Sequence, residues 1–347
     1  MKKFLFIFFF LVIITKINTS VVEKVIVKVN NENIMKSEYE KLLNVTLEQL
    51  KQLSAKELSE KEIKEIKQKV LDQLIADKLL LQEAKKRNIK VTKREIEEGI
   101  KTVKSRFPSD LMFYQELKKE NLTEKQFEKK IEEQIMVLKL IDEEIKKNLK
   151  EPTEAEAKEI FNKVIKIIEK KEDVKLPEEE KNELKLLAQL VERYFSEQVR
   201  VRHILIRVEP DFSKEKKEEA LKRAREIKSK IDKGEDFATL AQKYSEDPGS
   251  KDRGGDLGFI ARGDTVAEFE KVVFSLKEGQ VSDVFETKFG YHIAKVIEYR
   301  AKRKPDFEQI KEDLLQYVAR RNAEKYYEQF VEQLKSKAKI QYFEIIK

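Results

Sequence analysis

A block of residues, 199–299, places the strongest constraint on the fold of this chain. It opens and closes with a short, β-branched, apolar run, and the only two histidines of the chain, His203 and His292, lie in these two runs. Each run has the composition of a β-strand. Seven of the nine glycines lie from Gly249 to Gly290, in a stretch rich in turn-forming residues. The sequence therefore predicts a small module with special backbone geometry inside an otherwise helical, lysine-rich chain.

The motifs within this block resemble those of the parvulin peptidyl-prolyl isomerases. They follow one another in the same order as in that family: Arg202-His203-Ile204-Leu205, Tyr244-Ser245, Asp247-Pro248-Gly249-Ser250, Gly254-Gly255-Asp256-Leu257-Gly258, Phe269 and Phe289-Gly290-Tyr291-His292. The resemblance implies a small α+β domain, similar to the FKBP fold, that isomerises the peptide bond before proline.

The chain as a whole is similar to the extracytoplasmic foldases of the SurA and PrsA type. This resemblance implies an α+β protein with a mostly helical chaperone domain built from both chain ends and one parvulin domain. We expect a signal peptide at 1–20, an N-terminal helical domain at 21–198, the parvulin domain at 199–299, and a C-terminal helix and strand at 304–347 that complete the helical domain. Residues 154–197 are predicted to form two additional charged helices, to which the sequence assigns no function.

Residues 1–20 have the features of a secretory signal. Lys2 and Lys3 precede a run of eleven apolar residues at 4–14, and a more polar stretch follows. The apolar run is too short to span a bilayer as a helix. We therefore expect cleavage after Ser20 and a periplasmic or otherwise extracytoplasmic location without stable membrane insertion. An uncleaved anchor is the alternative.

The region that follows is predicted to be helical, and several helix starts are marked by capping boxes. These pairs are Ser59 with Glu62, Thr92 with Glu95, Thr123 with Gln126, and Thr153 with Glu156. Apolar residues recur every three or four positions between these starts, which is typical of amphipathic helices. We interpret these apolar faces as core, with a peptide-binding surface as the alternative.

The C-terminal segment predicts how the helical domain is closed. Residues 307–337 have the pattern of one long amphipathic helix, and the runs 24–29 and 340–346 alternate like strands. Leaving about half a dozen large apolar side chains of this helix in water would forgo on the order of 10 kcal/mol. We therefore expect the helix to dock on the N-terminal helices and the first strand to pair with the last. A groove beside this joint is the candidate client site.

Isomerisation of a proline peptide bond breaks no covalent bond. The barrier of about 18–20 kcal/mol arises from amide conjugation, so a catalyst needs an apolar pocket for the proline ring and polar groups that shape the site. The resemblance assigns the polar, catalytic positions to His203, Asp247, Thr287 and His292. We favour a hydrogen-bonded histidine pair that holds the site in shape over proton transfer. Asp247 precedes a proline and is equally compatible with a turn residue.

The resemblance assigns the proline pocket to Leu257, Thr265, Phe269 and Phe289. Thr265 stands where the family most often has methionine, so its shorter, polar side chain would make a shallower pocket. This departure favours an alternative function, a holdase chaperone whose parvulin domain is a weak or inactive peptide-binding module. The expected partners are in both cases unfolded or partly folded polypeptides that contain proline.

Composition argues against several other classes of function. Charged residues make up 40% of the chain, but the net charge is only +7 and both signs alternate along the helical segments. A nucleic-acid-binding protein would need a basic stripe with aromatic residues, and none is evident. The absence of cysteine excludes disulfides and a thiolate nucleophile. Two histidines without a His-Glu-x-x-His helix do not make a zinc site, so we expect no metal and no cofactor.

Overall fold

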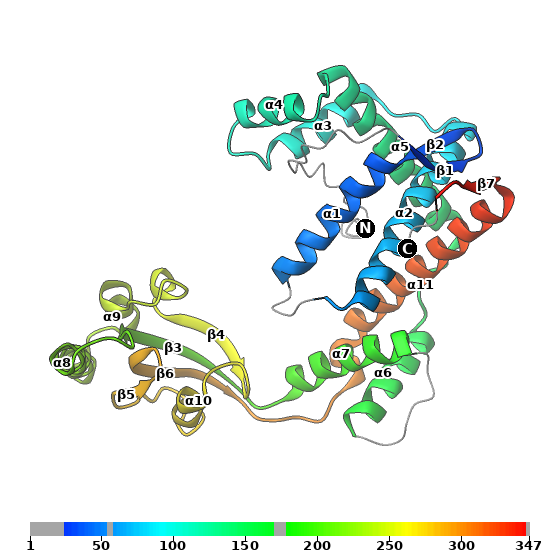
Figure 1. Ribbon diagram of the computed structural model, residues 1–347. Helices are drawn as coiled ribbons and strands as arrows, with labels where there is room; N and C mark the ends of the chain where they lie inside the picture. Colours follow the sequence, from blue (N-terminus) through cyan, green and yellow to red (C-terminus); the bar gives the residue numbers. More distant parts are fainter. Residues whose placement is uncertain (1–23, 54–57, 170–177, 345–347) are drawn as a thin grey trace. The chain divides into compact units, whose positions relative to one another are not determined.

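The computed structural model describes three parts of the chain, residues 24–53, 58–169 and 178–344. They belong to two compact units, whose elements are labelled in Figure 1. The first unit draws on both chain ends, within Met1–Thr153 and Leu315–Lys347, and the second is the continuous segment Glu154–Leu314. The expected signal peptide at 1–20 lies outside the described residues. Within the described ranges, no helix combines the length and hydrophobicity needed to cross a bilayer.

The first unit consists of helices and one small antiparallel sheet. Its elements are β1 (Val25–Val29), β2 (Glu32–Met35), α1 (Lys36–Leu53), α2 (Glu60–Lys86), α3 (Lys93–Lys104), α4 (Asp110–Lys119), α5 (Glu124–Asn148), the later part of α11 (Phe307–Lys337) and β7 (Ile340–Tyr342). The strand order of the sheet is β2-β1-β7. In Figure 1, β7 at the red end of the chain lies beside β1 at the blue end.

Local sequence signals determine where these helices begin. Three of the expected capping boxes are present, formed by Ser59 with Glu62, Thr92 with Glu95, and Thr123 with Gln126. In each box the threonine or serine accepts from a backbone N–H of the first turn, and the partner side chain accepts from the N-cap backbone N–H. Asn30 has a positive φ of 54°, which asparagine tolerates, and makes the tight turn between β1 and β2.

The core of the first unit forms where the two chain ends meet. Phe330 and Val331 of α11 are buried together with Leu80 of α2. β7 pairs antiparallel with β1, and Val27 lies opposite Tyr342. The expectation that the helical domain is built from both chain ends is confirmed.

The second unit has a four-stranded antiparallel sheet with the order β4-β3-β6-β5. Its elements are α6 (Glu154–Ile168), α7 (Glu178–Phe195), β3 (Gln198–Arg207), α8 (Lys214–Asp232), α9 (Phe237–Tyr244), the 3-10 helix η1 (Lys251–Arg253), β4 (Asp256–Ala261), α10 (Ala267–Val273), β5 (Phe285–Thr287), β6 (Gly290–Arg300) and the beginning of α11.

Different helices cover the two faces of this sheet. Ile204 of β3 and Ile293 of β6 lie in a core shared with α8 and α9. Val199 and Val201 of β3 lie in a second core, which is shared with α10. Because alternate residues of a strand point to opposite faces, His203 is on the α10 side of the sheet.

The division between the units differs from the expected boundary at 198, because α6 and α7 belong to the second unit. Phe161 of α6 packs edge-on against Phe307 of α11, with ring centroids 5.6 Å apart. Arg193 of α7 forms an ion pair with Asp264. The first residues of α11 therefore pack within the second unit, and only the later part of its apolar stripe docks on the N-terminal helices.

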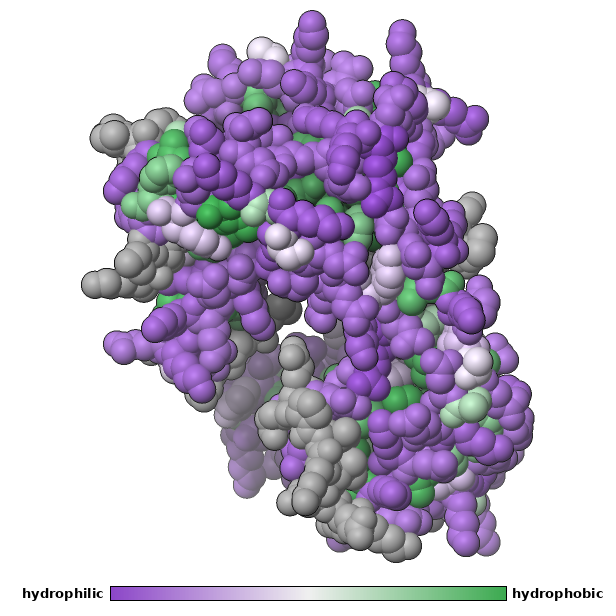
Figure 2. Space-filling view, turned by 90° about the vertical axis from the view of Figure 1, so that its right-hand side faces the viewer, coloured by the Kyte–Doolittle hydropathy of each residue, from purple (hydrophilic) through white to green (hydrophobic). Residues whose placement is uncertain are grey.

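The surface reflects the high content of charged residues. On the face drawn in Figure 2, hydrophilic side chains cover most of the area, and hydrophobic side chains are visible in small areas between them. Many charges are paired along a helix at a spacing of four residues, as in Arg94 with Glu98 and Lys228 with Asp232. Such exposed pairs contribute little stability and keep the helix surfaces solvated.

Candidate active site

The two histidines come from neighbouring strands of the second sheet. β3 and β6 pair antiparallel, with His203 opposite Ala294 and His292 opposite Leu205. The imidazole rings stack with centroids 5.6 Å apart, and their Nδ1 atoms are 3.4 Å apart. Only 6% of His203 and 4% of His292 is exposed. The strand register therefore brings the predicted histidine pair together.

Two glycines permit the close backbone contacts that hold β3 in place. Gly255 has a φ of +77°, and a Cβ added there would lie 2.2 Å from the carbonyl oxygen of His203. Gly290 has a φ of +131°, and an added Cβ would lie 2.2 Å from the carbonyl oxygen of Ile206. No side chain fits at such a distance, and both φ values lie in the region that favours glycine.

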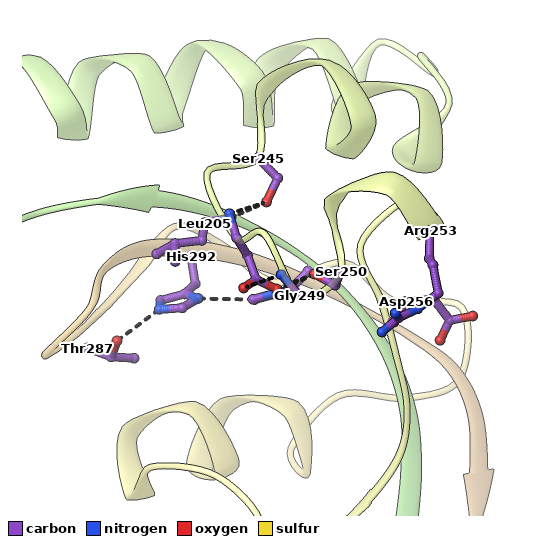
Figure 3. Close-up of polar contacts among 10 residues, drawn as sticks. Leu205, Ser245, Gly249, Ser250, Arg253, Asp256, Thr287 and His292 are labelled. Atoms are coloured by element: carbon purple, nitrogen blue, oxygen red, sulfur yellow. Dashed lines mark hydrogen bonds and ion pairs between the residues drawn. The ribbon is translucent and has the colours of Figure 1, made fainter. Parts of the chain in front are cut away.

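A loop between α9 and η1 brings a carboxylate to the histidine pair. Ser245 Oγ accepts a hydrogen bond from the backbone N–H of Leu205 at 3.2 Å, which attaches the loop to β3 (Figure 3). Asp247 Oδ1 accepts from the backbone N–H of Gly249 at 3.2 Å, which fixes the carboxylate in an Asx turn. Asp247 Oδ2 then lies 2.9 Å from His203 Nε2. Asp247 is thus both a turn residue and a partner of the histidine pair.

Ser250 is a further member of this network that the sequence analysis did not single out as a site residue. Its Oγ lies 3.0 Å from His203 Nε2, and its hydroxyl donates to Asp247 Oδ2. The side chain is buried, with 1% exposed. The signal was present in the sequence, because Ser250 ends the turn-forming run Asp247-Pro248-Gly249-Ser250.

The hydrogen bonds determine one consistent set of tautomers. His203 Nε2–H donates to the Asp247 carboxylate, so His203 Nδ1 is an acceptor. His292 Nδ1–H then donates to His203 Nδ1, which leaves His292 Nε2 to accept from the hydroxyl of Thr287 at 2.8 Å (Figure 3). The Thr287 oxygen in turn accepts from the backbone N–H of Phe289 at 3.1 Å. In this assignment every imidazole nitrogen has a partner and both rings are neutral.

Burial keeps both rings uncharged near neutral pH. Burial, and then the neighbouring His203, lower the pKa of His292 to about 3. Burial also lowers the pKa of His203, although Asp247 opposes the shift. Burial by itself would raise the pKa of Asp247, but hydrogen bonds from Ser250 and His203 outweigh it and lower the pKa. The site therefore presents two neutral imidazoles and one carboxylate, which favours a hydrogen-bonded pair over proton transfer.

An apolar cluster lies against the histidine rings. Phe269 of α10 is buried and meets both rings edge-on, with centroid distances of 5.7 Å to His203 and 5.4 Å to His292. Phe285 of β5 stacks on His292 at 5.4 Å, a contact that the sequence analysis missed. Leu257 of β4 packs against the same cluster and is partly exposed. Aromatic and aliphatic side chains thus adjoin the polar network.

The other two predicted pocket residues are placed differently. The backbone N–H of Thr265 donates to Glu270 Oε1 at 3.1 Å, and its hydroxyl oxygen is shielded from solvent with no hydrogen-bond partner in the described part of the chain. Phe289 lies in the turn between β5 and β6, with 50% exposed and the ammonium of Lys288 5.2 Å from its ring. Phe289 therefore lies on the surface, outside the cluster around Phe269.

The polar groups of the site satisfy one another. Among residues 24–53, 58–169 and 178–344, no group of three His, Cys, Asp or Glu side chains is arranged to hold a metal ion. The Asp247 carboxylate and the two imidazoles are fully engaged in the network described above.

Comparison with protein families identifies the class to which these features belong. Residues 184–300 match the family model of the PPIC-type PPIase domain, and residues 2–141 match that of the SurA-like N-terminal domain. The second unit therefore contains a parvulin-type peptidyl-prolyl isomerase domain, joined in one chain to a SurA-like domain.

Comparison with individual proteins identifies the family. The chain is 32% identical over 334 residues to the foldase protein PrsA of Caldanaerobacter subterraneus subsp. tengcongensis, which covers 92% of this chain and 87% of that protein. It is 30% identical over 317 residues to the foldase protein PrsA of Clostridium acetobutylicum, with 89% and 85% covered. The chaperone SurA of Alkalilimnicola ehrlichii is 41% identical over 141 residues, which are 41% of this chain and 32% of that protein. The chain belongs to the PrsA foldase family.

Proposed function

We propose that this chain isomerises X-Pro peptide bonds in unfolded or partly folded polypeptides outside the cytoplasm, and that its helical unit holds these clients. Family membership and the PPIC-type domain support the reaction class. The proposal for the site rests on the neutral pair of His203 and His292. His203 is hydrogen-bonded to Asp247, and His292 is hydrogen-bonded to Thr287.

The geometry suits a reaction in which no bond is broken. The peptide bond before proline loses conjugation as it twists, and an apolar environment with preset polar groups favours this state over the planar amide. Phe269 and Leu257 supply the apolar wall. The histidine pair and Asp247 hold the polar side of the site in one arrangement without supplying a mobile proton.

Activity is tested with the purified full chain and a proline tetrapeptide in a protease-coupled assay. We expect a rate above that of the uncatalysed reaction, and equality of the two rates would refute the proposal. Since the pKa of His292 is about 3 and that of His203 is lowered from its ordinary value, the rate should not change between about pH 7 and pH 9. A bell-shaped profile centred near neutral pH would instead indicate proton transfer.

Two phenylalanines provide a matched comparison for the pocket. Phe269 is buried against both histidine rings, so Phe269→Leu should lower kcat/KM by about tenfold through the loss of aromatic contacts. Phe289 is half exposed, and Phe289→Leu should leave kcat/KM within about twofold of the wild type. The opposite order of effects would show that the pocket is formed at the β5–β6 turn.

Thr265 stands where the family most often has methionine, and its shielded hydroxyl has no hydrogen-bond partner within the described residues. A shorter, polar side chain makes a shallower pocket, which favours a second candidate function, a holdase with a weak isomerase site. A variant with His203→Ala and His292→Ala separates the two activities. Full suppression of client aggregation without isomerase activity would place the holdase function in the helical unit. Loss of both activities in a folded variant would place client binding in the isomerase domain.

Export is a separate part of the proposal and is supported by the basic and apolar pattern of residues 1–20. Cell fractionation and N-terminal sequencing of the mature chain test it. We expect a mature chain that begins after Ser20 outside the cytoplasm. A cytoplasmic chain that retains Met1 would refute export.

A further inference from the structure

Helix α7 carries apolar side chains on two sides, and only one side is buried. Leu184 and Val191 are buried, at 0% and 5% exposed. Leu186, Leu190 and Tyr194 are 60%, 58% and 47% exposed. Their spacing of four residues places these three side chains in one row along the helix. We call this row the α7 stripe; a contiguous row of large apolar side chains on a surface marks an interaction site more often than isolated ones do.

The α7 stripe ends beside residues 261–264, the segment that leads to the apolar cluster around Phe269. Arg193, next to Tyr194, donates two hydrogen bonds to the carboxylate of Asp264, with Nη2–Oδ2 and Nε–Oδ1 distances of 2.7 and 3.2 Å. Asp264 also accepts from the backbone N–H of Ala261 at 2.8 Å, and it directly precedes Thr265. A bidentate ion pair of this kind fixes the orientation of the two groups as well as their distance. Two residues after Asp264, Val266 packs against the cluster of Phe269 and Leu257 that we propose as the proline pocket, so the end of the stripe is attached to the segment that leads to this cluster.

A second set of contacts reinforces this attachment. Glu197 follows α7, and its carboxylate accepts from Arg262 Nε at 3.0 Å and from the hydroxyl of Tyr299 at 3.1 Å. The guanidinium of Arg262 in turn lies over the ring of Phe274, 4.3 Å from its centroid. The stripe and the pocket segment thus belong to one framework within the second unit.

We propose that the α7 stripe is an apolar subsite for the client chain whose proline occupies the pocket. The ligand is an unfolded polypeptide that carries large apolar side chains at alternate positions, a few residues away from its proline. The proposal rests on the isomerase function proposed above, and it extends the substrate from the X-Pro bond to its flanking sequence.

The spacing of the stripe fits an extended client. A helix rises about 1.5 Å per residue, so Leu186 and Leu190 are about 6 Å apart along the axis. An extended chain places every second side chain about 6.6 Å apart. The residue before proline is itself restricted to extended conformations, so a client leaves the pocket in a suitable form. Continuity with the pocket is what identifies a client chain as the occupant.

The test uses the full chain and three peptides that share one Ala-Ala-Pro-Phe centre: the tetrapeptide, a longer peptide with leucine at alternate flanking positions, and the same peptide with serine instead. Exchange NMR of the X-Pro bond gives kcat/KM for each. The variant combines Leu186→Gln with Leu190→Gln, which keeps side chains that favour helix. The control is Glu192→Gln on the same helix, on a flank away from the stripe.

We expect the wild type to prefer the leucine peptide to the serine peptide by about tenfold. The double variant should lose this preference while its rate on the tetrapeptide stays unchanged, and the control should retain both. Equal rates of the wild type on the two long peptides, or a preference that survives in the variant, would overturn the proposal. So would light scattering that shows a wild-type dimer which the variant dissociates, because a second copy would then cover the stripe. A wild-type rate on the tetrapeptide that equals the uncatalysed rate would refute the isomerase function instead.

Discussion

A buried carboxyl in the first unit makes its stability depend on pH. Asp77 lies on α2; its Oδ1 accepts a hydrogen bond from Gln73 at 2.8 Å, whereas its Oδ2 is shielded from solvent and has no partner within the described residues. Burial raises the pKa of Asp77 to about 7; Gln73 and Lys78 oppose the shift, and Glu38 adds to it. Burial, and then the charge of Asp77, raise the pKa of the phenol of Tyr327 on α11.

The direction of the effect follows from the proton balance. The pKa of Asp77 is about 7 in the folded chain and 3.8 in a model peptide. Between these values the folded chain retains a proton that the unfolded chain has lost, so stability falls as pH rises. The difference of about three pKa units corresponds to a loss of about 4 kcal/mol once the pH exceeds the folded pKa.

Asp77→Asn removes the charge and should therefore stabilise the first unit at pH 8 by up to about 4 kcal/mol, with little effect near pH 4. Chemical denaturation followed by circular dichroism across this range, at constant ionic strength, measures the difference. The matched control is Asp72→Asn on the same helix, where 43% of the side chain is exposed. If Asp77→Asn and the wild type lose stability in parallel from pH 5 to pH 8, the carboxyl is not the titrating group and the reasoning is wrong.

Three further predictions concern the site and the chain ends. Gly255→Ala places a methyl group against the carbonyl of His203 and should destabilise the second unit by about 3 kcal/mol or more, which a denaturation midpoint equal to that of the wild type would contradict. Thr287→Val leaves His292 Nε2 buried without its donor and should cost about 1–3 kcal/mol; an unchanged unfolding curve and unchanged imidazole nitrogen shifts would argue against the hydrogen bond. Truncation after Leu314 should abolish cooperative unfolding of the first unit and preserve that of the second, and two intact transitions would show that the C-terminal residues are dispensable.

Features that depend on neighbouring residues could be predicted from the sequence. The capping boxes at Ser59, Thr92 and Thr123 involve residues only three positions apart, so their chemistry is visible in the sequence. The pairing of the first and last strands was also predictable, because both runs alternate and the hairpin with β2 leaves one edge of β1 free for a further strand. The approach of His203 and His292 came from the resemblance, since the composition of two strands does not determine their register.

Features that depend on tertiary packing could not be predicted in the same way. The role of Phe285 requires the register of β5 against β6, which its three-residue strand does not specify. The position of α6 and α7 was not predictable because an amphipathic pattern shows that one face is buried but not which partner buries it. The sequence shows Asp77 as one more charge on a solvated helix, and only the packing of α2 shields its carboxylate from solvent.

The pairing of the chain ends determines when each unit can be completed. All strands of the second sheet lie within residues 198–300, so its contacts form within one short segment. In the first unit, Lys339 N–H donates to Asn30 Oδ1 at 2.9 Å across a separation of 309 positions. Each doubling of loop length costs only about 0.6 kcal/mol, so this distance is a small thermodynamic burden. The large sequence separation affects the order of folding instead. Until the C-terminal residues are available, β1 lacks β7 as its second neighbour and Leu80 is not covered by α11. By that point the isomerase unit can already be folded.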